Sequence, residues 1–470
     1  MLRGPMKKRS LILLGVLVGL TALPLTAADA KSNPHILYIL ADDMGYADPG
    51  FMGSKEIRTP NLDKLANEGT ILSSYYVQPV CSPTRSTLMT GRYVSHTGVY
   101  TVVRPNAPWG LPLGERLLPQ ALKEVGYETA IVGKWHLGEF QADYRPMQRG
   151  FDHQYGLWFG NIDYFTHQRD GVLDWHRDDQ PCKEEGYSTQ LIAKEACRLI
   201  RERKADKPLF MYLPFNGVHA PYQVPDNYSA AYPNLTGVRK TYAGMVTAMD
   251  EAIGQVLGAL EEMKMRENTL IIFSSDNGGP SPGRITNNGV LRGAKGTTYE
   301  GGIRVCAAVN WPGHIPAGKV VAEPLHGIDW YPTLLNLAGG SLEQKLPIDG
   351  KDIWNVLTQG AKSPHDALLL CGQSPKNCGV RMGDWKLLRK SAEETGEESG
   401  GGTGGDGAVR VELYNLADDL SEKHDLSKDN PEKAKLLLAE LDRLMKDAVA
   451  PGEKGQPQKQ GQKNPKQPAK

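Results

Sequence analysis

Short apolar runs alternate with longer amphipathic segments over much of the chain. The runs that predict buried strands lie at residues 35–40, 129–132, 209–213 and 270–273. Helices are predicted between them at residues 60–67, 118–125, 188–203 and 241–263. In the last of these, apolar side chains recur at helical spacing from Tyr242 to Leu260. Strands that alternate with helices favour an α/β fold with a mostly parallel central sheet flanked by helices.

The pattern changes after about residue 353. Residues 379–388 and 411–416 predict two strands of an antiparallel pair, and 470 residues exceed what one hydrophobic core usually serves. We therefore expect a larger α/β domain at 31–353 and a smaller C-terminal domain at 354–450. Glu, Gly, Ser and Thr dominate residues 392–407, which predicts a flexible insert, and the Lys, Gln, Pro and Gly of residues 451–470 predict a disordered basic tail.

The N-terminal 30 residues have the composition of a signal peptide. Basic residues precede an apolar run at 11–20, and small residues end at Ala28-Asp29-Ala30. The apolar run is too short for a comfortable membrane span, although an uncleaved anchor is the alternative. We expect an exported protein, periplasmic or secreted, or lysosomal or extracellular in a eukaryote, with no stable membrane insertion.

The net charge bears on the class of binding partner, and the cysteines bear on disulfide bonding. The 54 basic and 54 acidic residues give zero formal net charge, which argues against a nucleic-acid partner. Export would place the six cysteines in an oxidising compartment, where the short spacing of Cys371 and Cys378 favours a local disulfide.

Polar residues follow each predicted strand of the sheet. Parallel strands present their carboxyl ends at one edge, so these residues should meet there. Hard oxygen donors that suit Ca²⁺ better than Mg²⁺ are Asp42, Asp43, Asp276 and Asn277. Groups that could surround an oxyanion with positive charge and proton donors are Arg85, Lys134, His136, His219 and Lys295. Taken singly, each has a plainer explanation as a helix cap, a turn or a surface residue.

A cysteine begins the most distinctive stretch of the chain. Ser82 is a good N-cap and Pro83 suits the first turn, so Cys81 should lie at a helix N-terminus, where free N–H groups favour an anion or an ionised nucleophile. The simpler alternative is an ordinary buried cysteine before a capped helix.

The string Cys-x-Pro-x-Arg followed by Ser-Thr-Leu-x-Thr-Gly-Arg, at residues 81–92, resembles the signature of type I sulfatases. Residues 41–48, 133–138, 276–279 and 293–296 resemble other motifs of that family in the expected order. The resemblance implies the fold of the alkaline phosphatase superfamily, with the catalytic site in residues 31–353.

The same resemblance implies cofactors and residue roles. A formylglycine-generating enzyme would convert Cys81 to formylglycine (3-oxoalanine), whose hydrate is the nucleophile. The implied Ca²⁺ ligands are Asp42, Asp43, Asp276, Asn277 and the converted Cys81. The implied catalytic residues are Cys81, Arg85, Lys134, His136, His219 and Lys295.

Residues 218–221 and 243–252 particularly resemble the arylsulfatase B branch, which removes 4-O-sulfate from N-acetylgalactosamine. The expected function is hydrolysis of O-sulfate esters on a sulfated sugar or oligosaccharide. Aromatic and His residues at 150–180 are of the types that line sugar sites. Two departures from the family are Cys306, where proline is frequent, and the 392–407 insert. The alternatives are a phosphonate or phosphate monoester hydrolase of the same superfamily and a non-catalytic protein that binds sulfated glycans.

Overall fold

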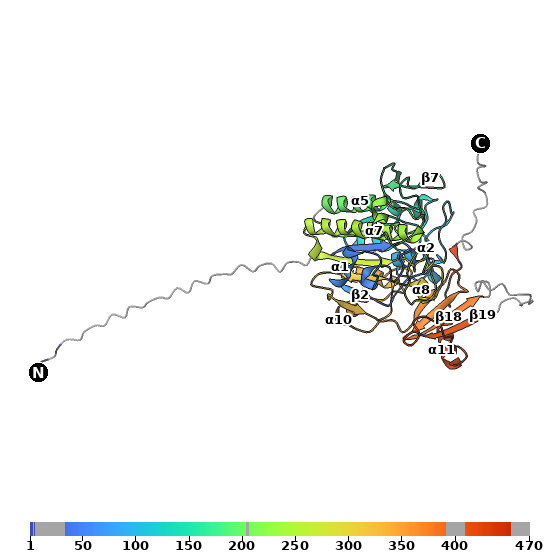
Figure 1. Ribbon diagram of the computed structural model, residues 1–470. Helices are drawn as coiled ribbons and strands as arrows, with labels where there is room; N and C mark the ends of the chain where they lie inside the picture. The colour runs from blue at the N-terminus through green and yellow to red at the C-terminus, as the bar shows by residue number, and fades with distance from the viewer. Residues whose placement is uncertain (3, 5–32, 204–205, 392–408, 453–470) are drawn as a thin grey trace, which may run out of the picture. The chain divides into compact units, whose positions relative to one another are not determined.

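A ten-stranded mixed sheet forms the centre of the protein in this computed structural model (Figure 1). The structure describes residues 1–2, 4, 33–203, 206–391 and 409–452. Almost all of the predicted signal peptide, the predicted insert and nearly all of the predicted tail therefore lie outside the described residues. Within the described ranges, no helix combines the length and apolarity that crossing a membrane requires.

The strand order places the predicted strands side by side. The sheet runs β14 (Lys319–Val321), β2 (Thr70–Leu72), β13 (Ala307–Asn310), β11 (Thr269–Ser275), β1 (His35–Ala41), β10 (Leu209–Pro214), β4 (Glu128–Val132), β5 (His153–Gly156), β8 (His176–Arg177) and β9 (Gln180–Pro181). The five strands from β11 to β5 are mutually parallel, with Leu37 of β1 opposite Met211 on one side and Ile271 on the other. Strands β13 and β8 join this parallel centre in the antiparallel sense. The predicted α/β fold with a mostly parallel centre is confirmed.

Alternate residues of the central strands feed two separate cores. Tyr38 of β1 packs into the first core and Leu37 into the second, as the period-two geometry of a strand requires. Helices that contribute to the first core are α2 (Cys81–Thr90), α4 (Leu118–Glu124), α9 (Trp330–Leu337) and α10 (Trp354–Gln359). Those that contribute to the second are α1 (Pro60–Asn67), α5 (Ser188–Glu202) and α7 (Gly237–Glu262). The sheet is thus buried on both faces, which explains why its strands read as continuous apolar runs.

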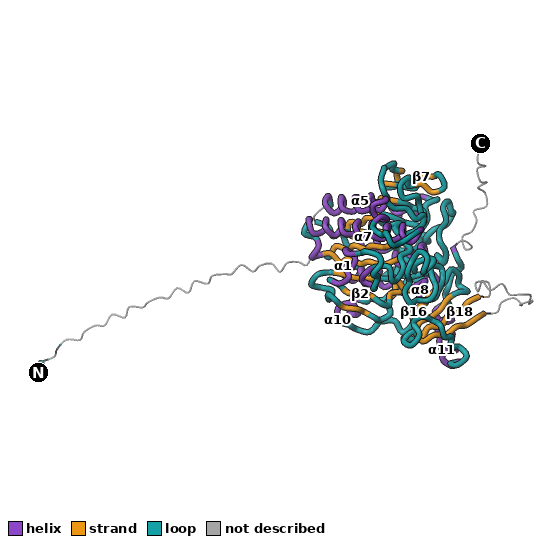
Figure 2. The backbone as a smooth tube through the Cα atoms, in the orientation of Figure 1, coloured by secondary structure: helices purple, strands orange, loops and turns teal. Residues whose placement is uncertain are grey.

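The tube view shows how loops are distributed around these layers. In Figure 2 the helices α5 and α7 lie toward the left, and loops gather on the right around α8 (Glu300–Ile303). Two small sheets lie outside the central one. Strands β3 (Tyr75–Tyr76), β12 (Arg304–Val305) and β15 (Leu325–His326) form a three-stranded sheet, and β6 (Gln168–Arg169) and β7 (Val172–Leu173) form a two-stranded hairpin at the top of Figure 2. Short helices are α3 (Val94–Thr97) and α6 (Asp226–Ala230).

A four-stranded antiparallel sheet near the C-terminus confirms the predicted change of architecture. Its order is β16 (Leu368–Cys371), β17 (Cys378–Met382), β18 (Trp385–Ser391) and β19 (Val409–Asn415), and α11 (Pro431–Leu444) packs on it. The prediction of one strand over 379–388 was wrong. That stretch holds β17, a tight turn and β18, and Gly383 at the turn has φ +59°. Glycine adopts this left-handed conformation without the Cβ clash of other residues.

The predicted disulfide is not formed in the structure. Cys371 and Cys378 lie opposite each other across β16 and β17, yet all six cysteines carry free thiols.

A buried ion network joins the antiparallel sheet to the loop region around α8. Lys386 of β18 is completely buried, and its Nζ lies 2.8 Å from carboxylate oxygens of both Glu300 and Glu422. Glu422 also accepts the backbone N–H of Glu300 at 2.7 Å, and the hydroxyl of Tyr76 donates to Glu300 at 2.7 Å. Each buried charge therefore has a partner, and the network links β18 to the start of α8.

Replacing the buried cation should destabilise the protein strongly. Lys386→Met leaves Glu422 buried without a cation among the described residues and leaves Glu300 with Arg304 alone, so we expect the free energy of unfolding to fall by about 3–5 kcal/mol. The matched control is Lys362→Met, which removes an ion pair to Glu323 from a lysine that is 91% exposed. Its expected cost is at most about 1 kcal/mol. Urea unfolding midpoints measure both, and equal midpoints for the two variants would show that the network contributes no more than a surface pair.

Candidate active site

Side chains from four adjacent parallel strands meet at the carboxyl edge of the central sheet. Asp42 and Asp43 follow β1, Asp276 and Asn277 follow β11, Lys134 and His136 follow β4, and His219 comes from the loop after β10. Backbone bonds hold these strand ends together: the N–H of Asp276 donates to Ala41 O at 2.9 Å, and that of Lys134 donates to Pro214 O at 2.8 Å. The structure thus brings the predicted residues to one place.

The carboxylates and the amide form a connected group. Asn277 Nδ2 donates to Asp43 Oδ1 at 2.7 Å, and the backbone N–H of Asp43 donates to Asp276 Oδ1 at 3.2 Å. Asp42, Asp276 and Asn277 are fully buried and Asp43 is nearly so. A set of buried oxygen donors this close together requires compensating positive charge.

Three basic side chains supply that charge. Lys134 Nζ donates to Asp42 Oδ2, and Lys295 Nζ lies 2.7 Å from Asp43 Oδ1. Arg85 donates through Nε and Nη2 to Asp276 Oδ2 at 3.2 and 2.8 Å, and through Nη1 to the carbonyl of Lys134. In this structure the guanidinium therefore braces Asp276 and the β4 loop.

Opposing effects set the proton affinities of the two innermost carboxyl groups. Burial alone would raise the pKa of Asp42, but Lys134 and the other cations outweigh it and hold that pKa well below its usual range. Burial raises the pKa of Asp276 to about 6, and the neighbouring Asp42 carboxylate adds to the rise.

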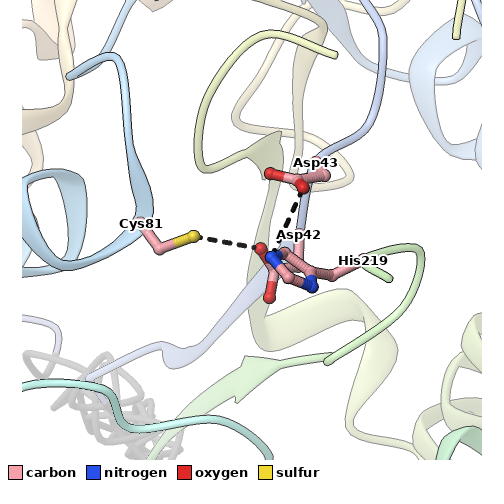
Figure 3. A group of neighbouring side chains, drawn as sticks. All are labelled: Asp42, Asp43, Cys81 and His219. Carbon is pink, nitrogen blue, oxygen red and sulfur yellow. Dashed lines mark hydrogen bonds and ion pairs between the residues drawn. The ribbon is translucent and has the colours of Figure 1, made fainter. Parts of the chain in front are cut away.

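Cys81 is the first residue of α2 and points at the carboxylates. Figure 3 shows its Sγ directed toward Asp42, whose Oδ1 lies 3.3 Å away. Burial and the carboxylates of Asp276 and Asp42 raise the pKa of the Cys81 thiol. This is the reverse of the environment that activates a cysteine as a thiolate nucleophile.

The predicted cap of this helix was wrong. Val80 precedes α2 with no side-chain cap, and Ser82 lies inside the helix. The Ser82 hydroxyl instead donates to the carbonyl of His136 at 2.7 Å and accepts the N–H of Val103 at 3.0 Å. The local capping pattern was overridden because this hydroxyl ties α2 to the β4 loop.

Two histidines flank the group. His219 Nε2 lies 3.5 Å from Asp43 Oδ2, the contact drawn in Figure 3. His136 is buried, and its Nδ1 has no hydrogen-bond partner among the described residues. Burial lowers the pKa of His136 well below its usual value, and Lys134 and Arg85 reinforce the effect, while burial also lowers the pKa of His219.

The donor set fits a divalent cation with oxygen ligands. One atom each of Asp42, Asp43, Cys81 and His219 lies within 4.8 Å of the others. Asn277 Oδ1 is buried and has no partner in the part of the chain that the structure describes, as expected of an amide oxygen that completes its bonding on a metal. Sequence reasoning assigned His219 a catalytic role only; its place beside Asp43 could be found only from the fold of the loop after β10.

The aromatic segment at 150–180 differs from the expectation. Trp158, Tyr164 and Trp175 are buried core residues, while Phe159 is half-buried and Phe165 is exposed. Most of its large rings therefore pack inside the protein and do not line an open site. The segment still reaches the site through its backbone, because the N–H of His136 donates to Trp158 O at 3.0 Å.

Sequence comparisons show which known proteins this chain is similar to. The sulfatase family profile matches residues 34–341. Arylsulfatase J of Mus musculus is 43% identical over 356 residues, covering 74% of this chain and 59% of that protein. The N-acetylgalactosamine-6-sulfatase of Canis lupus familiaris is 36% identical, covering 73% of this chain and 70% of that protein. The chain thus matches less than two thirds of arylsulfatase J.

Solved structures give the same answer for the fold. The crystal structure of Ps i-CgsB in complex with k-i-k-neocarrahexaose is 34% identical, with a TM-score of 0.81, and the match covers 89% of this chain and 94% of that one. The predicted alkaline phosphatase-like sulfatase fold is confirmed. From the matched profile, the relatives and the fold, we conclude that the chain belongs to the sulfatase family.

Proposed function

We propose that the protein is a sulfuric ester hydrolase that removes O-sulfate from a sulfated carbohydrate. The observation that carries this proposal is Cys81, which lies at the start of α2 with its Sγ 3.3 Å from Asp42, inside a buried group of carboxylates and cations. A site of this kind can bind a sulfate ester between a cation and several proton donors.

The residues present suit two groups that the resemblance implies. Formylglycine at position 81 would supply a hydrated aldehyde oxygen as the nucleophile. A Ca²⁺ ion held by Asp42, Asp43, Asp276 and Asn277, next to position 81, would supply Lewis acidity toward a sulfate oxygen. Conversion of Cys81 would need a formylglycine-generating enzyme as a maturation partner.

Side chains of this protein would bind the sulfate group and transfer the protons. Lys134 and Lys295 carry positive charge toward the negative sulfate oxygens, and Arg85 holds Asp276 in place. His219 and Lys295 both contact Asp43 Oδ2, and we propose that His219 gives a proton to the departing sugar oxygen. His136 carries a ring nitrogen that has no partner among the described residues, and we propose that it accepts the proton of the second hydroxyl of the hydrate.

Support for a carbohydrate substrate comes from the relatives. One is named N-acetylgalactosamine-6-sulfatase, and one structural neighbour was solved with a neocarrahexaose. We propose galactose or N-acetylgalactosamine residues as the sulfated sugar, with 4-O-sulfate as the first position to test. An exported location, periplasmic or secreted, agrees with such an extracellular polymer.

Matched substrates test the activity. We expect kcat/KM on a 4-O-sulfated galactosaminide or a sulfated galactan oligosaccharide to exceed that on an aryl phosphonate by at least about 100-fold, or about 2.7 kcal/mol of transition-state discrimination. The corresponding 6-O-sulfated sugars and an aryl sulfate complete the panel, and released sulfate is measured by ion chromatography. Equal or faster turnover of the phosphonate would indicate a phosphonate monoester hydrolase.

Position 81 should be indispensable for turnover. Cys81→Ala cannot be oxidised to the aldehyde, and the unoxidised serine of Cys81→Ser lacks the second hydroxyl of the hydrate, so we expect sulfate release to fall by at least about 10³-fold in both variants. Cys182→Ser, at a half-buried cysteine outside the site, should keep full activity. Mass spectrometry of the peptide carrying residue 81 should show the aldehyde in active protein, and an active protein whose Cys81 is wholly unmodified contradicts the proposal.

Metal removal should abolish activity and lower thermal stability. Chelation takes the cation from buried carboxylates, so Ca²⁺ added back at about 100 times its Kd should restore activity and about 2.7 kcal/mol of stability. Asn277→Leu removes one ligand and should lose most of the Ca²⁺-dependent gain in Tm. Asn310→Leu is the control, since this buried amide donates to Leu65 O elsewhere. Full activity after exhaustive chelation would refute the calcium site.

A further inference from the structure

We propose that Asp174 is a positioning residue for His136, acting through the segment from Trp158 to Gly160. The inference rests on the proposed function, in which the His136 ring handles a proton. It assigns a role to a residue outside the sulfatase motifs.

The His136 side chain lacks the hydrogen bond that usually fixes a catalytic imidazole. Its Nδ1 is buried without a partner among the described residues. Its backbone is firmly held, with φ +59°, its N–H bound to Trp158 O and its carbonyl bound by Ser82. The direction of the ring must therefore be set by what packs against it.

Gly160 is the residue that packs against the His136 ring. A Cβ added to Gly160 would lie 2.6 Å from Cε1 and 2.7 Å from Nε2 of His136, closer than real Cβ contacts come. The backbone at 160 thus lies directly against the imidazole, and a small shift of this segment would move or release the ring.

Asp174 holds this segment in place. Its Oδ1 accepts the N–H of Trp158 at 3.1 Å, and its Oδ2 accepts the N–H of Phe159 at 2.6 Å. Asp174 lies between β7 and β8, is fully buried, and donates its own N–H to His167 O at 2.9 Å. One carboxylate therefore ties the chain on the N-terminal side of Gly160 to the β7–β8 connection.

The segment is also held through the Trp158 side chain. The rings of Trp158 and His176 stack with centroids 3.6 Å apart and 5° between their planes, and the Arg145 guanidinium lies 4.6 Å from the Trp158 ring. Burial raises the pKa of Asp174 to about 7, so keeping a carboxylate here is costly. The two N–H groups of the segment offset that cost.

Three variants test the proposal. Gly160→Ala pushes a methyl group into the imidazole; Asp174→Asn keeps the shape but turns an amide NH₂ toward a backbone N–H; and Asp250→Asn is the matched control. Asp250 is likewise buried and accepts two successive N–H groups, those of Asn61 and Leu62, but at the start of α1. Gly258→Ala, in open space on α7, controls for the added methyl group.

Kinetics on the sulfate ester that the wild type hydrolyses fastest give the first readout. For Gly160→Ala and Asp174→Asn we expect kcat to fall about 10- to 100-fold while KM changes less than about threefold, because ring placement affects the reaction more than binding. Asp250→Asn and Gly258→Ala should keep kcat within about twofold. Thermal melts show whether each variant is folded.

The second readout follows the ring itself. In protein labelled at histidine Cε1, the His136 signal among the 11 histidines is identified by its loss in His136→Gln. It should shift or broaden in Gly160→Ala and Asp174→Asn and stay in place in Asp250→Asn and Gly258→Ala.

Each outcome decides between the proposals. Asp174→Asn with wild-type kcat and an unmoved His136 signal overturns the positioning role, as does an equal loss of kcat in Asp250→Asn. A wild type that releases no sulfate from any ester, although its Cys81 is converted, refutes the proposed function instead. The histidine signal would still report whether Asp174 holds the ring.

Discussion

Compensation of buried charge is the constraint on which this structure depends. At the carboxyl edge of the central sheet, Asp42 and Asp276 are fully buried beside Lys134 and Arg85, which are equally buried. Transferring any one of these charges from water alone would cost several kcal/mol, and mutual pairing offsets that cost only if the geometry is tight. Parallel strands with both faces covered by helices provide that rigidity. The fold can therefore hold charged side chains in a buried site that excludes bulk water, where electrostatic interactions are weakly screened.

The same principle recurs between the central sheet and the antiparallel sheet. Lys386 of β18 forms an ion pair with Glu300 at the start of α8. Glu300 comes five residues after Lys295, which lies in the loop before α8. This ion pair therefore joins the C-terminal strands to the loop that carries Lys295. Their contribution is to fix the end of a segment whose other part contacts Asp43.

Sequence patterns predicted the parts of the fold that have strong periodicity. The central strands and α1, α5 and α7 were located to within a few residues because their apolar pattern is also their packing pattern. The common location of Asp42, Asp276 and Lys134 could be predicted because each comes just after a parallel strand and the strand ends meet at one edge. The rest depended on tertiary contacts that no local pattern encodes. Ser82 looks like a cap but bonds to His136, and Trp175 is of a type that lines sugar sites but is fully buried. The β17–β18 turn is different, because Gly383-Asp384 is a local turn signal that the prediction of one strand over 379–388 passed over. Asp174 has no local signal at all, because its role comes from two N–H groups 15 and 16 residues earlier in the chain.

The burial of Cys81 has a consequence for biosynthesis. The residue is 1% exposed, and its helix is buried along its whole length. The conversion to formylglycine that we propose would need access to this thiol, which the folded protein does not offer. That modification would therefore have to precede the docking of α2, and the two processes would compete in time. The rate of folding relative to the rate of modification would then set the fraction of active molecules in a preparation. Conditions that slow the folding of the chain would raise that fraction.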